Sequence, residues 1–138
     1  MVKTIASTIG IAALMCSAFA LTLSKNDEIA RDAAVQWLQL VDAGRNDEAA
    51  SQGSSEVRSF EQWQKYFADH RALLGRVNKR QFVEIKRTAI ISGVPDVRRY
   101  YVVRFRTVFE RPPVAMENIT IAKIGCCWEI FGYTISDR

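Results

Sequence analysis

Few side chains in this sequence are of the types that carry out catalysis. The chain has a single histidine, His70, which follows Asp69 in a segment whose apolar residues include Trp63 and Phe67. Because His70 is offset from those apolar residues, a solvated helix position is favoured over a general base, which needs a dry pocket and a partner. No serine-nucleophile signature, phosphate-binding loop or zinc signature occurs. The residue types therefore predict no catalytic site.

Cysteine chemistry is confined to one adjacent pair near the C-terminus. Cys16 lies in an N-terminal apolar run, which leaves Cys126 and Cys127 for the rest of the chain. Neighbouring residues close only a tight, strained ring, so a bond between them would join no distant segments. With one histidine and no second cysteine cluster, the sequence predicts neither a metal site nor a cofactor. We interpret one or both of them as small apolar strand residues.

Basic residues are concentrated in one part of the chain. Residues 78–111 carry nine Lys and Arg against three Asp and Glu, although the net charge of the whole chain is only +4. Strand alternation places Arg104 and Arg106 on one face, and Arg98 joins them if the strand stays regular. Such a surface either keeps the sheet soluble or attracts an anionic partner.

The first 20 residues predict an export signal. Lys3 precedes an apolar run from Ile5 to Phe19, and the small residues Ala18 and Ala20 flank Phe19. This order is typical of a signal peptide cleaved after Ala20. A retained inner-membrane anchor is the alternative, but a spanning helix needs about 20 strongly apolar residues. We expect a periplasmic or secreted protein without a transmembrane span after cleavage, and nucleic acid is not expected as a partner there.

Residues 21–138 are expected to form a single domain whose first half is helical. Apolar spacing predicts a helix that is capped by Asn26 or Asp27 and ends at Gly44. A short helix over 46–52 and a longer one over 59–74 are expected to follow. The residues predicted on buried helix faces are Ile29, Ala33, Ala34, Trp37, Leu40, Val41, Phe60, Trp63, Phe67, Leu73 and Leu74.

After Asn78 the pattern changes to strands. They are predicted over 81–92, 100–109, 116–124 and 128–135, with a turn at Gly125 and Cys126. Short connections indicate an antiparallel meander. The fold expected is α+β, with N-terminal helices packed on one face of a curved four-stranded sheet. A cystatin-like wrap and a nuclear-transport-factor-two-like (NTF2-like) cone both fit this order.

The strand alternation also suggests where a ligand would bind. Enzymes with the cone fold place Asp, His or Tyr inside the cone, whereas the inward positions here are mostly Val, Ile, Phe and Thr. Tyr101 and Tyr133 are the exceptions, and their hydroxyls are the best candidates to line a polar pocket. Trp37, Trp63 and Trp128 are expected to meet in the core.

Several segments, in order along the mature chain, resemble one known family. They include residues 37–44 (WLQLVDAG), 61–63 (EQW), 74–75 (LG), 93–96 (GVPD), 101–109 (YVVRFRTVF), 117–120 (ENIT) and 128–135 (WEIFGYTI). On these the chain resembles family 4019 of the domains of unknown function, small exported bacterial proteins. The resemblance implies a bacterial exported protein with one domain, and it implies no activity. Cys126 and Cys127 depart from the family, which usually has Gly with a polar neighbour there.

Together these patterns favour an exported binding or accessory domain that is not an enzyme. Its expected partner is an anionic component of the cell envelope or an envelope protein. One alternative is a small cone-fold hydrolase or isomerase with its site around Tyr101, Tyr133 and His70. The other is a structural subunit of an envelope complex.

Overall fold

The computed structural model describes residues 22–94, 96, 98–111 and 114–137. The predicted signal peptide, residues 1–20, lies outside these described residues. The helical segments are α1 (Lys25–Asp42), α2 (Asn46–Ser51) and α3 (Phe60–Tyr66), followed by the π turn η1 (Phe67–Arg71) and the 3₁₀ turn η2 (Ala72–Leu74). The strands are β1 (Val77–Thr88), β2 (Tyr100–Phe109), β3 (Ala115–Ile124) and β4 (Cys127–Ser136). Within the described ranges, no helix combines the length and the apolar character needed to cross a membrane.

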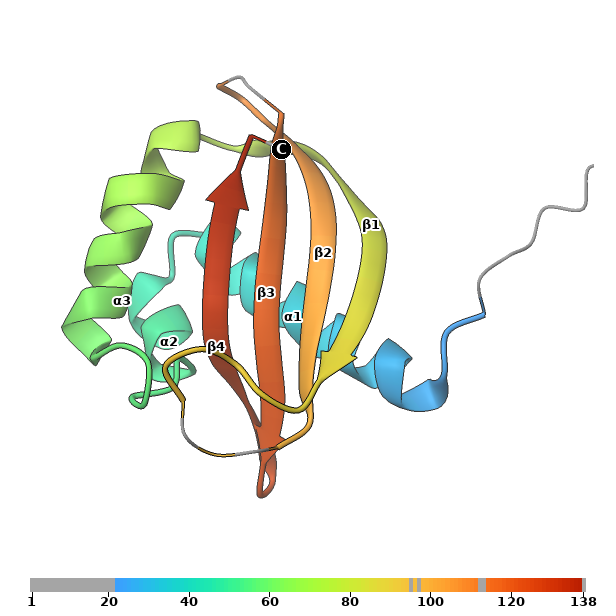
Figure 1. Ribbon diagram of the computed structural model, residues 1–138. Coiled ribbons are helices and arrows are strands. Elements are labelled where there is room, and N and C mark those ends of the chain that lie inside the picture. The colour runs from blue at the N-terminus through green and yellow to red at the C-terminus, as the bar shows by residue number, and fades with distance from the viewer. Residues whose placement is uncertain (1–21, 95, 97, 112–113, 138) are drawn as a thin grey trace, which may run out of the picture.

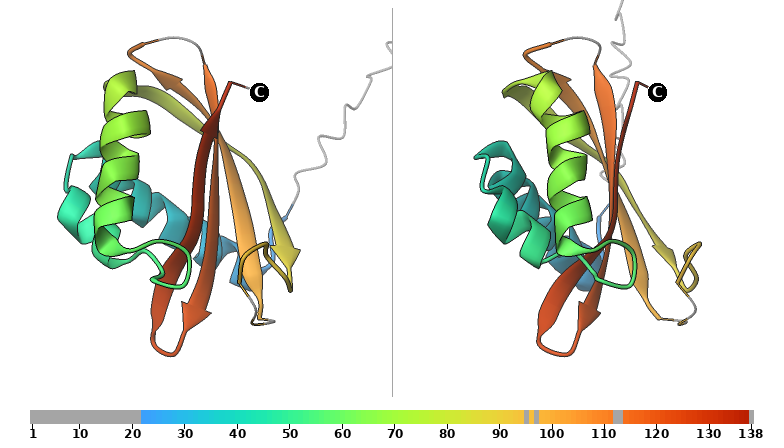
Figure 2. Two further views of the ribbon diagram at one scale, coloured as in Figure 1. Left: turned by 60° about the vertical axis from the view of Figure 1, so that its left-hand side comes forward. Right: turned by 90° about the vertical axis from the view of Figure 1, so that its left-hand side faces the viewer.

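The strands form one antiparallel sheet in the order β1-β2-β3-β4. The helices lie on one face of this curved sheet, and α1 runs across the strands (Figures 1 and 2). The predicted α+β fold, with helices on one face of a four-stranded meander, is therefore confirmed. We call the face that carries the helices the inner face and the opposite one the outer face.

Helix α1 begins two or three residues earlier than the sequence indicated. Ser24 is the N-cap, and its hydroxyl accepts a hydrogen bond from the backbone amide of Asp27 at 3.2 Å. A cap at Asn26 or Asp27 was therefore wrong, because the serine satisfies the first free amides. Ile29, predicted to be buried, is 43% exposed.

The segment after α2 winds unevenly. Ser59 and Gln62 form a capping box that starts α3, but the hydrogen bonding becomes π-helical at Phe67 and ends at Gly75, whose φ is +74°. A π turn changes the number of residues per turn, so the buried stripe no longer follows regular helical spacing. Leu73 is consequently 61% exposed, whereas Arg71 is buried.

Phe60 was also predicted on the buried stripe and is 43% exposed. It is the first residue after the Ser59 cap, where the chain has just entered the helix.

The first strand is displaced from its predicted position. β1 spans Val77–Thr88, not residues 81–92, and the described residues between Thr88 and Tyr100 belong to a loop that runs over one end of the sheet (Figure 1). This loop buries Val94 on the outer face, against Tyr100, Ala122 and Phe131. Apolar residues that resembled a strand end therefore serve a second, small core.

The main core lies between the inner face and the helices. Trp37 contacts Trp63, Phe67 and Tyr133, with ring centroids 6.3, 5.8 and 5.1 Å apart. The predicted alternation of β2 is confirmed, since Tyr101, Val103, Phe105, Thr107 and Phe109 are all buried. Trp128 does not join the other two tryptophans but lies half-buried near the open end of the sheet.

Candidate ligand-binding pocket

A network of charged side chains, built around the buried Glu117, joins the helices to one end of the sheet, and we call it the buried network. Glu117 of β3 is fully buried, and its Oε1 accepts hydrogen bonds from Nε of Arg80, at 2.8 Å, and from the hydroxyl of Thr107. The hydroxyl of Tyr133 donates to the other carboxylate oxygen, Oε2. All acceptor oxygens of this buried carboxylate are thus supplied with donors, as burial of a charge requires.

Arg80 connects this carboxylate to a second one. Its Nη1 and Nη2 donate to the carboxylate of Asp42, at 2.6 and 3.0 Å, and Nη2 of Arg71 donates to Asp42 at 3.1 Å. Two carboxylates therefore face two guanidinium groups, and the network is electrically neutral. Burial opposes the charge of Arg80, but the hydrogen bonds that it donates to Asp42 and the charge of Glu117 outweigh burial and raise the pKa of Arg80. Burial, with the nearby charge of Glu117, raises the pKa of Tyr133 well above its ordinary value.

The sequence did not point to this network. Asp42 was interpreted as a turn residue, and Arg71 becomes buried only because of the π turn. Glu117 did carry a usable signal. Glu117 alternates with Ile119 and Ile121 along β3, so the three side chains face the same side of the sheet. Strand alternation alone therefore predicts a buried carboxylate.

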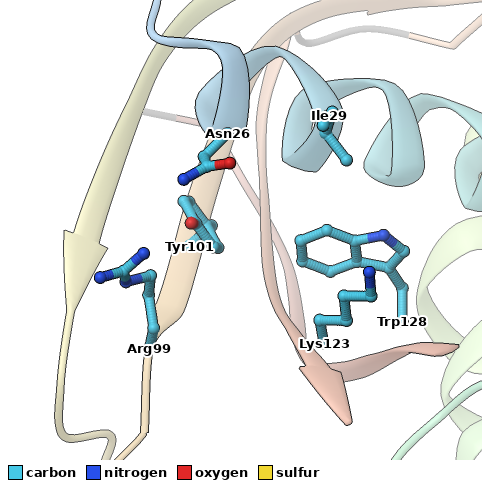
Figure 3. A pocket seen from close by; sticks show the side chains of 6 residues that line it. All are labelled: Asn26, Ile29, Arg99, Tyr101, Lys123 and Trp128. Carbon is cyan, nitrogen blue, oxygen red and sulfur yellow. The ribbon is translucent and has the colours of Figure 1, made fainter. Parts of the chain in front are cut away.

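A pocket of about 280 Å³ lies at the opposite end of the inner face, beside the start of α1 (Figure 3). On β2 it begins at Tyr101, six residues from Thr107 of the network, which corresponds to about 20 Å along a strand. Its lining residues come from α1, from β2 and the residue before it, and from the β3–β4 hairpin: Asn26, Ile29, Arg99, Tyr101, Lys123 and Trp128.

Two aromatic rings form the apolar wall of the pocket. Tyr101 is 5% exposed and contacts Trp128 edge-on, with ring centroids 5.9 Å apart and an interplanar angle of 68°. From α1, Asn26 lies above Tyr101 and Ile29 lies above the indole of Trp128 (Figure 3). The rings are held between helix and sheet, so the wall is preformed.

The charges of the pocket are positive. Arg99 and Lys123 are exposed, and in the part of the chain that the structure describes neither forms an ion pair. The neighbouring Arg87 is neutralised instead, because its Nε donates to Asp27 at 2.9 Å. This hydrogen bond holds the pKa of Asp27 below its ordinary value of 3.8. An aromatic wall beside two unpaired cations can hold an anion that has a flat apolar part.

The sequence pattern of the family described as protein of unknown function (DUF4019) matches residues 33–133. The chain belongs to the DUF4019 family. This confirms the family resemblance inferred from the sequence. No curated protein and no solved structure matches the chain. In this DUF4019 chain, the matched region contains the buried network and the sheet side of the pocket, whereas Asn26 and Ile29 precede it.

The two tyrosines that were expected to share a pocket lie apart in this DUF4019 domain. Tyr101 lines the pocket, whereas Tyr133 is 1% exposed and bonded to Glu117 in the network. His70 is exposed, and its ring lies 4.6 Å from that of Tyr66. The structure thus brings together neither the tyrosine pair nor the histidine.

The three arginines expected to form a basic surface are largely occupied. Arg98 pairs with Asp96 and Glu56 and lies 5.3 Å from the ring centre of Phe131. Arg104 faces outward and pairs with Glu84 at 3.5 Å. Among the described residues, Arg106 is the one of the three without an ion pair.

The cysteine pair lies at the tip of the hairpin that carries Lys123 and Trp128. Gly125, with φ of +61°, and Cys126 form the turn, and a disulfide joins Cys126 to Cys127. Both cysteines are exposed. Cys126 therefore lies in the predicted turn, and Cys127 begins β4, so one of the two is a strand residue, as the sequence suggested.

Proposed function

We propose that this protein is an exported binding module without enzymatic activity, and that it holds an anionic ligand in the pocket between α1 and the hairpin. One observation carries the proposal: Arg99 and Lys123 stand unpaired beside the wall of Tyr101 and Trp128. Elsewhere on the described surface many arginines face an acidic partner. Exported status follows from the sequence pattern of residues 1–20, and the anionic partner belongs to the bacterial envelope.

The buried network supports a binding role over catalysis. A general base needs a carboxylate or imidazole with a free lone pair aimed at a substrate. The carboxylates of Asp42 and Glu117 are instead occupied by Arg71 and Arg80, and Tyr133 donates its proton into the network. His70 lies on the surface, away from the pocket lining.

Of the two folds considered, we propose the cone-shaped NTF2-like arrangement over the cystatin-like wrap. Its support is the position of the pocket, at the open end of a curved inner face whose middle is filled by Trp37, Trp63 and Phe67. The ligand is then held at the mouth of the cone.

Benzoate, a flat anion, is a suitable first probe, with the uncharged benzamide as its counterpart. We expect isothermal titration calorimetry to show benzoate binding that weakens about tenfold or more in Arg99→Glu and in Lys123→Glu, since each reverses a charge at the pocket. Arg106→Glu is the matched control, because it makes the same change on the outer face.

Three outcomes would contradict the proposal. They are equal binding of benzamide, unchanged binding in both pocket variants, and loss of binding in Arg106→Glu, which would assign the ligand to the outer face. Native mass spectrometry of the protein from the envelope fraction of its host tests export separately. A chain that starts at Leu21 is expected, and an intact N-terminus would overturn signal cleavage.

A further inference from the structure

A second hollow of about 500 Å³ lies on the other side of Trp128. It is lined by α1, by the end of the α2 segment and by the start of β4: Ala33, Gln36, Leu40, Gln52, Cys127 and Trp128. Trp128 therefore lines both this hollow and the cationic pocket. Its half-buried indole is the wall that the two share.

The helix side of both hollows is one continuous stripe of α1. The α1 residues that line them are Asn26, Ile29, Ala33, Gln36 and Leu40. Successive members are three or four positions apart, which is the spacing of neighbours on one helix face. The first and the last are 14 positions apart, or about 21 Å at the rise of an α-helix. An elongated ligand can thus lie along α1 and cross the indole.

We infer that the two hollows form one site for an acidic oligosaccharide, an inference that rests on the function proposed above. A sugar carboxylate is held by Arg99 and Lys123. The apolar C–H face of a sugar ring packs on the indole of Trp128, whose ring face carries partial negative charge. The exposed amides of Gln36 and Gln52 donate hydrogen bonds to sugar hydroxyls and accept them.

The second hollow fits an oligosaccharide better than an extended peptide. Peptides commonly bind as an added strand on a free sheet edge. Beside this hollow the edge of β4 is occupied at Ile130, because Ser54 N donates to Ile130 O at 2.7 Å and Ile130 N donates to Gln52 O at 2.9 Å. An acyl chain fits less well too, since the exposed amides of Gln36 and Gln52 would face it.

The test compares three sugars with the full mature protein by isothermal titration calorimetry: tetragalacturonate, the monomer galacturonate, and the methyl-esterified tetramer. We expect the acidic tetramer to bind at least tenfold more tightly than the monomer, because only the tetramer reaches both hollows. The esterified tetramer should bind about tenfold or more weakly than the acidic tetramer, because it lacks the carboxylates.

Two variants locate the binding. Trp128→Ala should weaken binding of the tetramer about tenfold. Gln36→Ala should weaken binding of the tetramer severalfold and leave binding of galacturonate unchanged, because Gln36 lines only the second hollow. Alanine favours helix at this exposed position, so Gln36→Ala keeps the test open if Trp128→Ala fails to fold. Gln39→Ala is the matched control, exposed on α1 outside both hollows.

The outcomes separate the two proposals. If galacturonate or benzoate binds at the pocket but the tetramer binds no more tightly than the monomer, the extended site is overturned and the anion pocket stands. If polyglutamate or myristate binds and tetragalacturonate does not, the oligosaccharide is overturned in favour of a peptide or a lipid. If neither benzoate nor any of the acidic sugars binds, both proposals fail.

Discussion

Replacing Glu117 with glutamine would show how much the buried network contributes to the stability of the domain. Glutamine has nearly the same shape, but it lacks the charge that Arg80 faces, and its amide points donors at Tyr133 or Thr107, which are donors already. Removing one partner of a buried ion pair typically costs about 3–5 kcal/mol. Domains of this size are stabilised by only about 5–15 kcal/mol. We therefore expect Glu117→Gln to lose about 3–5 kcal/mol, a large share of the total.

The assay is urea unfolding followed by tryptophan fluorescence and far-ultraviolet circular dichroism. Glu84→Gln is the matched control, because Glu84 pairs with Arg104 and Lys86 at 3.5 and 3.6 Å but is 39% exposed. Exposed pairs contribute about 1 kcal/mol or less. The same chemical change should therefore cost several times more at Glu117 than at Glu84.

Equal losses in the two variants would refute this reasoning, and so would a loss below about 1 kcal/mol for Glu117→Gln. Thr107→Val keeps the test open if Glu117→Gln does not fold. It removes one donor to the carboxylate without changing the volume of the core, and hydrogen bonds to charged groups contribute about 1.5–3 kcal/mol. An unchanged unfolding free energy in Thr107→Val would contradict the network as well.

Three further predictions concern titration and packing. The folded-state pKa of Tyr133 lies above its ordinary value of 10.0, so its contribution to the stability of the fold is complete below pH 10.0 and is lost as the pH rises above it. In an alkaline titration the phenolate absorbance of Tyr133 should therefore appear only with unfolding, and Tyr133→Phe should remove that absorbance step. The folded-state pKa of Asp27 lies below 3.8, so its contribution to the stability of the fold is present above pH 3.8 and is lost on further acidification. Urea unfolding should therefore show that Asp27→Asn loses less stability than the wild type between neutral and strongly acidic pH. In Gly53→Ala the new Cβ would lie 2.3 Å from Nε1 of Trp63, so thermal unfolding should show a loss of about 1–3 kcal/mol, and an unchanged midpoint would contradict the close contact.

Periodicity made most of the fold predictable. The alternation of β2 separates buried from outward positions over ten residues, and the structure keeps that separation. The predicted position of β1 was wrong because apolar residues such as Ile91 and Val94 belong to the loop after β1 and pack on the outer face. Local pattern alone cannot distinguish a strand end from a loop that covers a small core.

The pocket was only partly predictable for a related reason. Strand alternation correctly turned Tyr101 inward, and this was the one predicted residue that the pocket contains. Lys123 and Trp128 are partners across β3 and β4, and the pairing of Tyr101 with Ile121 brings them and Arg99 beside it, while α1 covers the pocket from the helix side. Such a meeting depends on the packing of elements distant in sequence, and a spacing rule does not contain it.

The distribution of charge between the two ends of the inner face follows from what each end must do. Where Glu117 is fully buried, each charge needs an opposite partner, since an unpaired charge there would cost several kcal/mol. At the mouth, water solvates Arg99 and Lys123, so the fold tolerates them without partners. Stability therefore demands pairing at one end and leaves the other end free to keep its positive charge. Because the fold itself does not use the charges of Arg99 and Lys123, they remain available for a ligand, and this distinguishes the pocket from the buried network.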